Sequence, residues 1–168
     1  GGPLDALDVP VNTYTASEQA YPAATGLPAG GYLVVWTSGC GQPPVEGCTG
    51  EDGDSRGVFA RAFGADGSPA GAPFQVNETT EAAQLLGTAR VLSGGRLGIA
   101  WTGHHPTHGT TWQVYQRFYN VDTLAPLSGE IRVSQDATNT VEALRIAAVG
   151  TGHVVAWTYF LTDMTSSD

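Results

Sequence analysis

Two cysteines lie close together in a loop that is also rich in acidic residues. Cys40 and Cys48 are eight residues apart and are the two cysteines of the chain. A disulfide between them would close a short ring, which the chain-entropy model values at about 2.5 kcal/mol. The alternatives are two free thiols or half of a metal site, but a zinc site needs a second pair of ligands and no further cysteine exists. We therefore expect a disulfide, which implies an oxidising compartment.

Acidic residues follow the second cysteine in the segment E-D-G-D-S-R-G. Calcium takes about six to eight oxygen ligands, and Asp52 and Asp54 could supply part of such a set. The segment is not an EF-hand loop, because the spaced ligands and the terminal glutamate of that loop are missing. The other interpretation is a solvated hairpin tip, in which Asp and Gly supply the turn geometry. Calcium at Asp52 and Asp54 is thus a hypothesis, and no other cofactor is expected.

Three histidines occur together in the segment G-H-H-P-T-H-G, namely His104, His105 and His108. Imidazoles this close on a loop can hold a transition metal. The proline between them limits their convergence, and no carboxylate lies nearby in the sequence. The other interpretation is a polar loop that binds nothing.

The sequence contains no recognisable catalytic motif. Ser, His and Asp all occur, and G-D-S-R-G has the letters of G-x-S-x-G, but it leads into an expected strand and not from a strand into a helix as a nucleophile elbow does. No carboxylate pair of the glycosidase kind is evident. We therefore expect a protein that is not an enzyme. Aromatic side chains such as Trp112 and Tyr115 could instead stack on sugars at a binding surface, together with Tyr14, Tyr21 and Tyr119. Packing inside the sheets is the alternative role for these rings.

Composition and charge exclude several classes of partner. The chain has 16 acidic and 7 basic residues, for a net charge of −9. This charge argues against nucleic acid and anionic lipid, because phosphate binding needs clustered Lys and Arg. No apolar run approaches the roughly 18 residues of a membrane span. The expected partners are other protein chains or further repeats of the same chain, with glycan as a second kind of partner.

An internal repeat organises the chain. Each copy opens on a Val-Asn or Val-Ser pair and reaches a tryptophan 25, 25 or 24 residues after that valine. The pairs are Val11-Asn12, Val76-Asn77 and Val133-Ser134, and the tryptophans are Trp36, Trp101 and Trp157. The repeat divides the chain into an N-terminal arm over residues 1–10, unit 1 over 11–75, unit 2 over 76–132 and a partial unit 3 over 133–168.

Each complete unit predicts four antiparallel strands. In unit 1 these are P-A-A-T-G-L, Y-L-V-V-W-T, G-V-F-A-R-A-F and P-F-Q-V, and unit 2 matches them with G-T-A-R-V-L, L-G-I-A-W-T, W-Q-V-Y-Q-R-F and E-I-R-V. This alignment matches Phe63 to Phe118 and Arg61 to Gln116, with Arg117 one residue out of step. The segment T-V-E-A-L-R-I-A-A-V could be a helix by itself, but the repeat assigns it to a strand. Four strands per unit predict an all-β fold of β-propeller-like blades, with a β-sandwich as the alternative.

The number of units raises the question of how such a fold is completed. Unit 3 ends before its third and fourth strands, which leaves about two and a half units, whereas propellers close with about four to eight blades. We expect a portion of a longer protein, or a chain that associates with others through exposed strand edges. The arm segment L-D-A-L-D-V-P-V would then be a strand available for donation.

The repeat also resembles a known family. V-N-T-Y-T, G-G-Y-L-V-V-W-T-S, G-V-F-A-R-A-F-G-A-D-G-S-P-A-G and F-Q-V-N are similar to a repeat found in tandem in very large secreted bacterial proteins, which often carry haemolysin-type calcium-binding or cadherin-like regions. The resemblance covers nearly the whole chain and is strongest in unit 1. It implies an extracellular or cell-surface location and a repeated β fold, and it supplies no catalytic residues. We expect a structural or adhesive role in a secreted or surface assembly, with a lectin-like, calcium-assisted ligand-binding propeller as the alternative.

Overall fold

The computed structural model describes residues 9–40, 48–108, 111–135 and 141–159. Unit 1 contains β1 (Glu18–Leu27), β2 (Gly31–Gly39), β3 (Arg56–Phe63) and β4 (Phe74–Gln75). Unit 2 contains β5 (Gln84–Leu92), β6 (Arg96–Gly103), β7 (Gln113–Asn120) and β8 (Ile131–Arg132), with the short helix η1 (Pro106–His108) between β6 and β7. Unit 3 contains β9 (Val141–Val149) and β10 (Gly152–Tyr159). The all-β prediction is confirmed, and the ambiguous T-V-E-A-L segment is strand β9.

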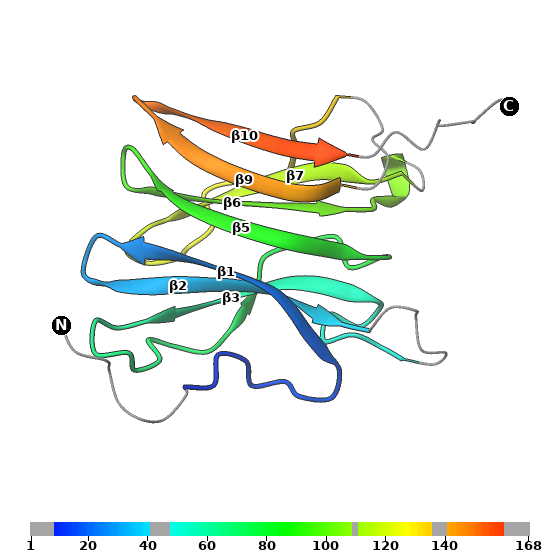
Figure 1. The fold of residues 1–168 in the computed structure, drawn as a ribbon, viewed down its shortest axis with the longest axis horizontal. Coiled ribbons are helices and arrows are strands. Elements are labelled where there is room, and N and C mark those ends of the chain that lie inside the picture. The colour runs from blue at the N-terminus through cyan, green and yellow to red at the C-terminus, as the bar shows by residue number, and fades with distance from the viewer. Residues whose placement is uncertain (1–8, 41–47, 109–110, 136–140, 160–168) are drawn as a thin grey trace, which may run out of the picture.

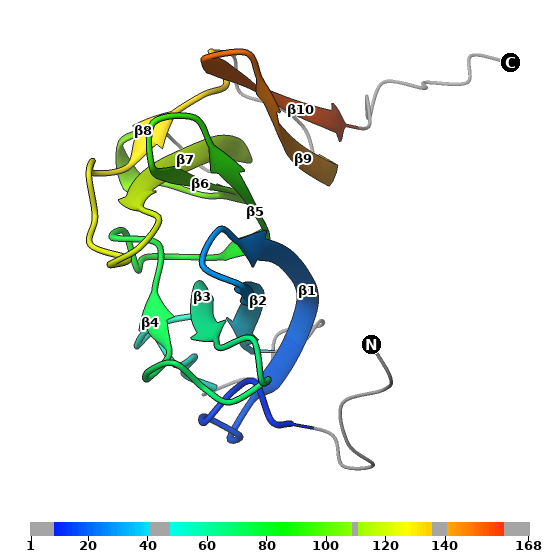
Figure 2. The same cartoon turned by 90° about the vertical axis from the view of Figure 1, so that its left-hand side faces the viewer.

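The strands form three antiparallel sheets, one for each unit. Two sheets have four strands in the orders β1-β2-β3-β4 and β5-β6-β7-β8, and the third consists of β9 and β10. The sheets follow one another like blades (Figure 1). In Figure 2 the first strands β1, β5 and β9 lie along one side, while β4 and β8 lie along the opposite side. The prediction of four-stranded, propeller-like units is confirmed, and the strands of the described ranges do not close into a ring.

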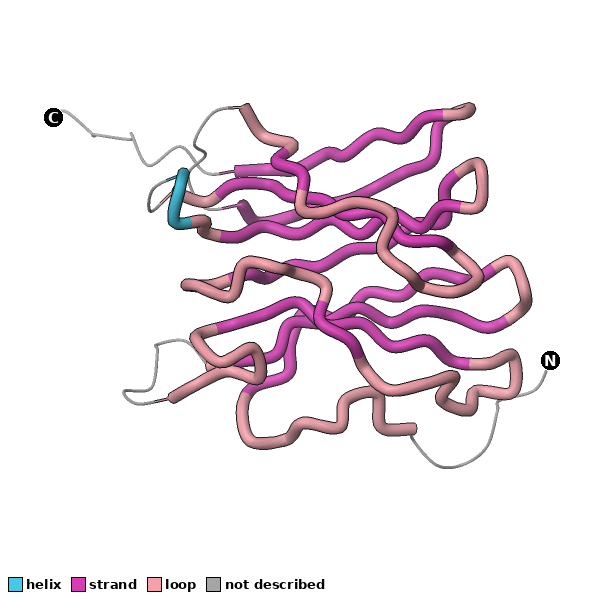
Figure 3. The backbone as a smooth tube through the Cα atoms, turned by 180° about the vertical axis from the view of Figure 1, so that it is seen from behind, coloured by secondary structure: helices cyan, strands magenta, loops and turns pink. Residues whose placement is uncertain are grey.

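Short apolar runs between glycine turns explain why these segments form strands. The second strand of unit 1 is rich in β-branched and aromatic residues, which favour a pleated, buried surface. Leu33, Val35 and Trp36 are all nearly or fully buried, so both faces of this strand are covered. The turn before it requires Gly31, where φ is +130° and an added Cβ would lie 2.3 Å from the carbonyl oxygen of Phe63. Strands dominate the described backbone when it is seen from behind (Figure 3).

The repeated tryptophans lie on the second strand and stack on the third. Trp36 pairs with Phe59 across the sheet, and their ring centroids are 6.3 Å apart. Trp101 pairs with Tyr115 in the same way, with centroids 6.1 Å apart. Both tryptophans are at most 4% exposed. These aromatic pairs fix how the second and third strands meet in each complete unit.

The structure corrects the alignment of the third strands by one residue. Counted from the tryptophan of the neighbouring strand, Arg61 occupies the position of Arg117 and not that of Gln116. Phe63 likewise corresponds to Tyr119. The expected alignment was wrong because the connection between the second and third strands differs in length between the two units. The sequence offers no fixed point across that connection, whereas cross-strand pairing does.

Cys40 and Cys48 form the expected disulfide, with their Cα atoms 5.9 Å apart. The bridge links the end of β2 to the segment that leads into β3, and residues 41–47 between the two cysteines lie outside the described part. The disulfide indicates an oxidising compartment. Most of the expected N-terminal arm, residues 1–8, is also outside the described ranges. Within these ranges, no helix has the length and apolar character needed to cross a membrane.

Candidate functional sites

The two aspartates of the acidic segment bind backbone amides of a tight turn. The amide of Asp54 donates to Oδ1 of Asp52 at 3.3 Å. The amide of Ala82, which belongs to unit 2, donates to Oδ2 of Asp54 at 2.6 Å. Asp54 therefore links unit 1 to unit 2. No three His, Cys, Asp or Glu side chains within the described ranges are grouped as a metal site requires.

Asp52 is the more unusual of the two carboxylates. Burial raises its pKa above the ordinary value, and the neighbouring charge of Asp54 adds to the rise. One oxygen each of Asp52 and Glu51 is buried without a hydrogen-bond partner in the described part of the chain. A cation would stabilise such oxygens, but two carboxylates are fewer ligands than calcium takes. The described contacts of this turn are those to backbone amides, and calcium at Asp52 and Asp54 stays a prediction.

The histidines of the unit 2 loop contact aromatic rings. The ring of His104 lies 4.1 Å from that of Trp112, measured between centroids. The ring of His105 lies 6.0 Å from that of Tyr115, and its Nδ1 accepts a hydrogen bond from the amide of Thr107 at 3.2 Å. The side chain of His108, the third residue of this predicted site, is outside what the structure describes. Among the described residues, no group of three or more His, Cys, Asp or Glu side chains suited to a metal includes these imidazoles.

Of the aromatic residues proposed for sugar stacking, Tyr115 is buried and Trp112 is partly buried. Tyr115 is 3% exposed between Trp101 and His105, and burial raises its pKa to about 12. Trp112 packs against the apolar cluster at the boundary of units 2 and 3. Packing is thus the observed role of both rings. Of the aromatic residues in that prediction, Tyr21 has a largely open ring, at 48% exposure.

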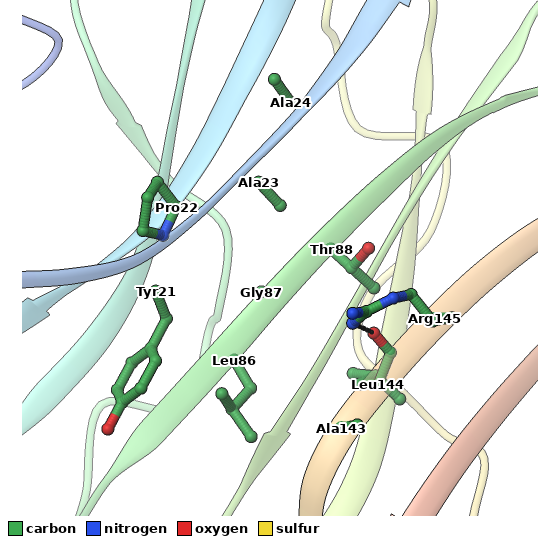
Figure 4. Close-up of a pocket in the computed structure, with 10 residues that line it drawn as sticks. All are labelled: Tyr21, Pro22, Ala23, Ala24, Leu86, Gly87, Thr88, Ala143, Leu144 and Arg145. Carbon is green, nitrogen blue, oxygen red and sulfur yellow. Dashed lines mark hydrogen bonds between the residues drawn. The ribbon is translucent and has the colours of Figure 1, made fainter.

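A cavity of about 340 Å³ lies where the first strands of the three units meet, and Tyr21 is at its edge (Figure 4). It is lined by residues 21–24 of β1, 86–88 of β5 and 143–145 of β9. Among the described lining residues, the ionisable groups are those of Tyr21 and Arg145. Nη1 of Arg145 donates to the carbonyl of Leu144 at 2.7 Å. A small ligand could bind here through the ring of Tyr21 and the charge of Arg145.

The cavity owes its shape to a β-bulge that recurs in the units. The pairing of β1 with β2 shifts at Tyr21, and the pairing of β5 with β6 shifts at Leu86. These residues have φ values of 52° and 59°, in the left-handed region that non-glycine residues seldom adopt. Both lie 15 residues before the tryptophan of their unit. Sequence reasoning missed the cavity because it looked for local motifs, whereas this constant spacing was the available signal.

The Val-Asn and Val-Ser pairs join each unit to the one before it. The amide of Val76 donates to the carbonyl of Val58 at 2.8 Å. In return, the amide of Val58 donates to Oδ1 of Asn77 at 2.8 Å. At the next boundary, the amide of Val114 donates to Oγ of Ser134 at 3.0 Å. The pair that marks the start of a unit in the sequence therefore completes the sheet of the preceding unit.

An arginine on the third strand of each complete unit binds the valine of the same pair. Nη1 of Arg61 donates to the carbonyl of Val11 at 3.1 Å, and Nη1 of Arg117 donates to the carbonyl of Val76 at 3.1 Å. Arg117 also forms an ion pair with Glu78 at 2.6 Å. The corrected alignment made this recurrence visible, because it places the two arginines at one position.

Comparison of this chain with protein-family models, with curated proteins and with solved structures gave no match. No family is assigned on that basis. The recurring junctions and the cavity between the first strands are the features from which a function is inferred.

Proposed function

We propose that this chain is a non-catalytic β-repeat module with a structural or adhesive role in an extracellular assembly. The observation that carries the proposal is the repeated junction. The residues that recur from unit to unit bind backbone groups or one another, as Asn77, Arg117 and Trp101 do. The recurring part of the sequence is therefore used to hold each sheet together and to join it to its neighbour. The disulfide supports a location outside the reducing cytoplasm, and the resemblance to tandem repeats of large secreted bacterial proteins agrees with it.

A lectin-like, ligand-binding role is the second candidate, and the cavity between the first strands favours it. Tyr21 offers an exposed ring at the edge of this cavity, and the apolar face of an aromatic ring can stack on a sugar. Arg145 could bind a carboxylate on the same ligand. Calcium assistance would be an additional feature of this candidate.

A glycan array probed with and without EDTA separates the two roles. The structural proposal expects no binding in either condition. The lectin candidate expects binding that is lost in Tyr21→Ala and in Arg145→Ala, and a calcium-assisted lectin would also lose binding in EDTA. Arg90→Ala is the matched control, because Arg90 is exposed on β5 outside the cavity lining. Glycan binding by the wild type would contradict the structural proposal.

A further inference from the structure

Units 1 and 2 pack through a residue that precedes a tryptophan. Val35 comes directly before Trp36 and is fully buried. A Cβ added to Gly87 of β5 would lie 2.6 Å from Cγ1 of Val35 and 2.7 Å from Cγ1 of Val58. Gly87 thus leaves the room that the two valines of unit 1 occupy. We call Val35 the donor residue of this contact and Gly87 its receiver residue.

Units 2 and 3 repeat this contact with different sizes of side chain. The donor position of unit 2 is Ala100, which is fully buried in a cluster with Val114, Val141 and Leu144. The receiver position, 11 residues after the valine that opens each unit, is Leu144 in unit 3. Cross-strand pairing agrees, because the residue after each receiver pairs with the residue before the tryptophan. A larger donor is therefore matched with a smaller receiver at the first boundary, and a smaller donor with a larger receiver at the second.

The receiver side of unit 1 is open. A cavity of about 140 Å³ lies there, and its lining includes Val11, Asn12, Gln19, Pro22 and Trp36. The first three are partly exposed. The corresponding residues of unit 2 are Val76, Asn77 and Gln84. They are 0%, 3% and 1% exposed, respectively, because unit 1 covers them. The cavity therefore lies on the surface of unit 1 that corresponds to the surface of unit 2 covered by unit 1.

The donor side of unit 3 is also open. Val149, the last residue of β9, is 57% exposed, whereas Leu92 at the end of β5 is 5% exposed. Val154 is 50% exposed, whereas Leu33, at the corresponding position three residues before the tryptophan, is fully buried. Ala156, the donor residue of unit 3, is exposed. One end of the molecule therefore presents a donor surface and the other end a receiver surface.

The sizes of the two free positions fit each other. The receiver residue of unit 1 is Pro22, which is larger than Gly87 and leaves less room for a donor. The donor residue of unit 3 is Ala156, which is smaller than Val35. A small donor facing a large receiver continues the inverse relation of the two internal boundaries. Close-packed interiors make such a relation necessary.

We propose that the donor surface of unit 3, at Val149, Val154 and Ala156, packs onto the receiver surface of unit 1 in a second copy of this chain. The interface continues the two boundaries inside each molecule and rests on the proposed structural role. Because unlike surfaces meet, the assembly is a ring or a filament.

Two complementary variants test this head-to-tail contact. Val154→Arg blocks the donor surface and leaves the receiver intact. Ala24→Arg blocks the receiver surface, because Ala24 corresponds to Ala89 of unit 2, which is buried by unit 1. Leu127→Arg is the matched control, since Leu127 is 55% exposed on neither surface. Light scattering measures the mass of each protein and of the mixture of the two blocked variants, and circular dichroism checks that each variant is folded.

The wild type and Leu127→Arg are expected to associate as concentration rises. Each blocked variant alone should stay at 17.4 kDa, and their mixture should form a one-to-one dimer through the single intact pair of surfaces. A wild type that stays monomeric at all concentrations overturns the inference but not the proposed function, which the glycan array tests separately. If mixing the two blocked variants does not restore association, the contact in the wild type joins like surfaces. This result also overturns the inference. If Val154→Arg is unfolded, Val149→Arg replaces it as the donor variant.

Discussion

Asn77 shows how one buried polar side chain holds two units together. It is 3% exposed, and its Oδ1 accepts the amide of Val58. Its Nδ2 donates to the carbonyl of Thr79 at 2.9 Å and to Oε1 of Gln84 at 3.1 Å. A buried amide with all these bonds stabilises the fold, and removing it leaves buried partners unsatisfied. Asn12 is the same residue of unit 1, in a partly exposed setting.

Asn77→Ala should lower the free energy of unfolding by about 1–3 kcal/mol, because the amide of Val58 and the side chain of Gln84 each lose a buried partner. Asn12→Ala is the matched control and should cost less, since water reaches the corresponding groups in unit 1. Urea unfolding at low protein concentration measures both. Equal costs for the two substitutions would contradict the joining role of Asn77.

Deprotonation of Tyr119 should lower the free energy of unfolding at high pH. Burial raises its pKa from 10.0 to about 12, and its hydroxyl donates to the carbonyl of Val76 at 3.1 Å. The folded state therefore holds this proton more tightly than the unfolded state. The resulting stability is fully present below about pH 10 and is lost as the pH rises towards 12, by up to about 1.4 kcal/mol per pH unit.

Tyr119→Phe should flatten this part of the stability curve and should cost about 1 kcal/mol at neutral pH through the lost hydrogen bond. The slope that remains would come from Tyr115, whose pKa is raised in the same way. Urea unfolding at several pH values between 8 and about 12 makes the comparison. An unchanged slope in the variant would show that Tyr119 does not titrate in that range.

At the scale of elements, the first strands of units 2 and 3 pack against strands of the preceding unit. β5 contacts β1, β2 and β3 of unit 1, and β9 contacts β5 and β6 of unit 2. The fit at these boundaries depends on paired sizes, as Val35 with Gly87 and Ala100 with Leu144 illustrate. Exchanging one partner without the other should therefore disturb the packing of two units at once.

Gly87→Ala should destabilise the fold by about 1–3 kcal/mol, because its Cβ would overlap Val35 and Val58. Val35→Ala alone should cost about 2 kcal/mol by leaving a cavity. The double variant makes room in the donor for the added Cβ of the receiver and should cost less than the sum by about 0.5 kcal/mol or more. Gly87→Ala combined with the distant Leu127→Ala should be additive. Additivity in both pairs would contradict the paired-size account.

The disulfide cross-links the connection between β2 and β3, but the pairing of these two strands does not depend on it. The amide of Cys40 donates to the carbonyl of Ser55 at 2.9 Å, beside the ion pair of Arg56 with Glu18. Replacing Cys40 and Cys48 by serine should lower the free energy of unfolding by about 2.5 kcal/mol and leave the sheets intact. Thermal unfolding with and without reductant measures the cost. A wild type that loses its sheet signal on reduction would contradict this expectation.

At the scale of the whole molecule, the sequence could predict the units and their strands because Val-Asn pairs, glycine turns and tryptophans recur at constant spacing. It could not predict the register of Arg61 and Arg117, which only cross-strand pairing fixes. It could not reveal the cavity beside Tyr21 either, because three distant segments and two bulges create it. The sequence pointed to Asp52 and Asp54 as calcium ligands by type, and it did not show that they accept hydrogen bonds from the amides of Asp54 and Ala82.

The net charge of −9 per chain should make head-to-tail association depend on salt. Copies of like charge repel one another, while the contact at Val149 and Val154 is apolar. Association should therefore strengthen as salt rises from about 0.01 M to about 1 M, over which the screening length falls from about 30 Å to about 3 Å. Sedimentation velocity at both salt concentrations measures it. Weaker association at high salt would indicate a contact held by ion pairs.

The junction at Val76 has a mechanical consequence. Its amide is bonded to β3 of unit 1, while its carbonyl accepts hydrogen bonds from Arg117 and Tyr119 of unit 2. A pull on the chain ends therefore reaches each sheet through a residue anchored in two sheets. Peeling β4 away from β3 would loosen unit 2 at the same moment. Under tension such a chain should yield in steps larger than one unit, which suits a segment that transmits force between the parts it connects.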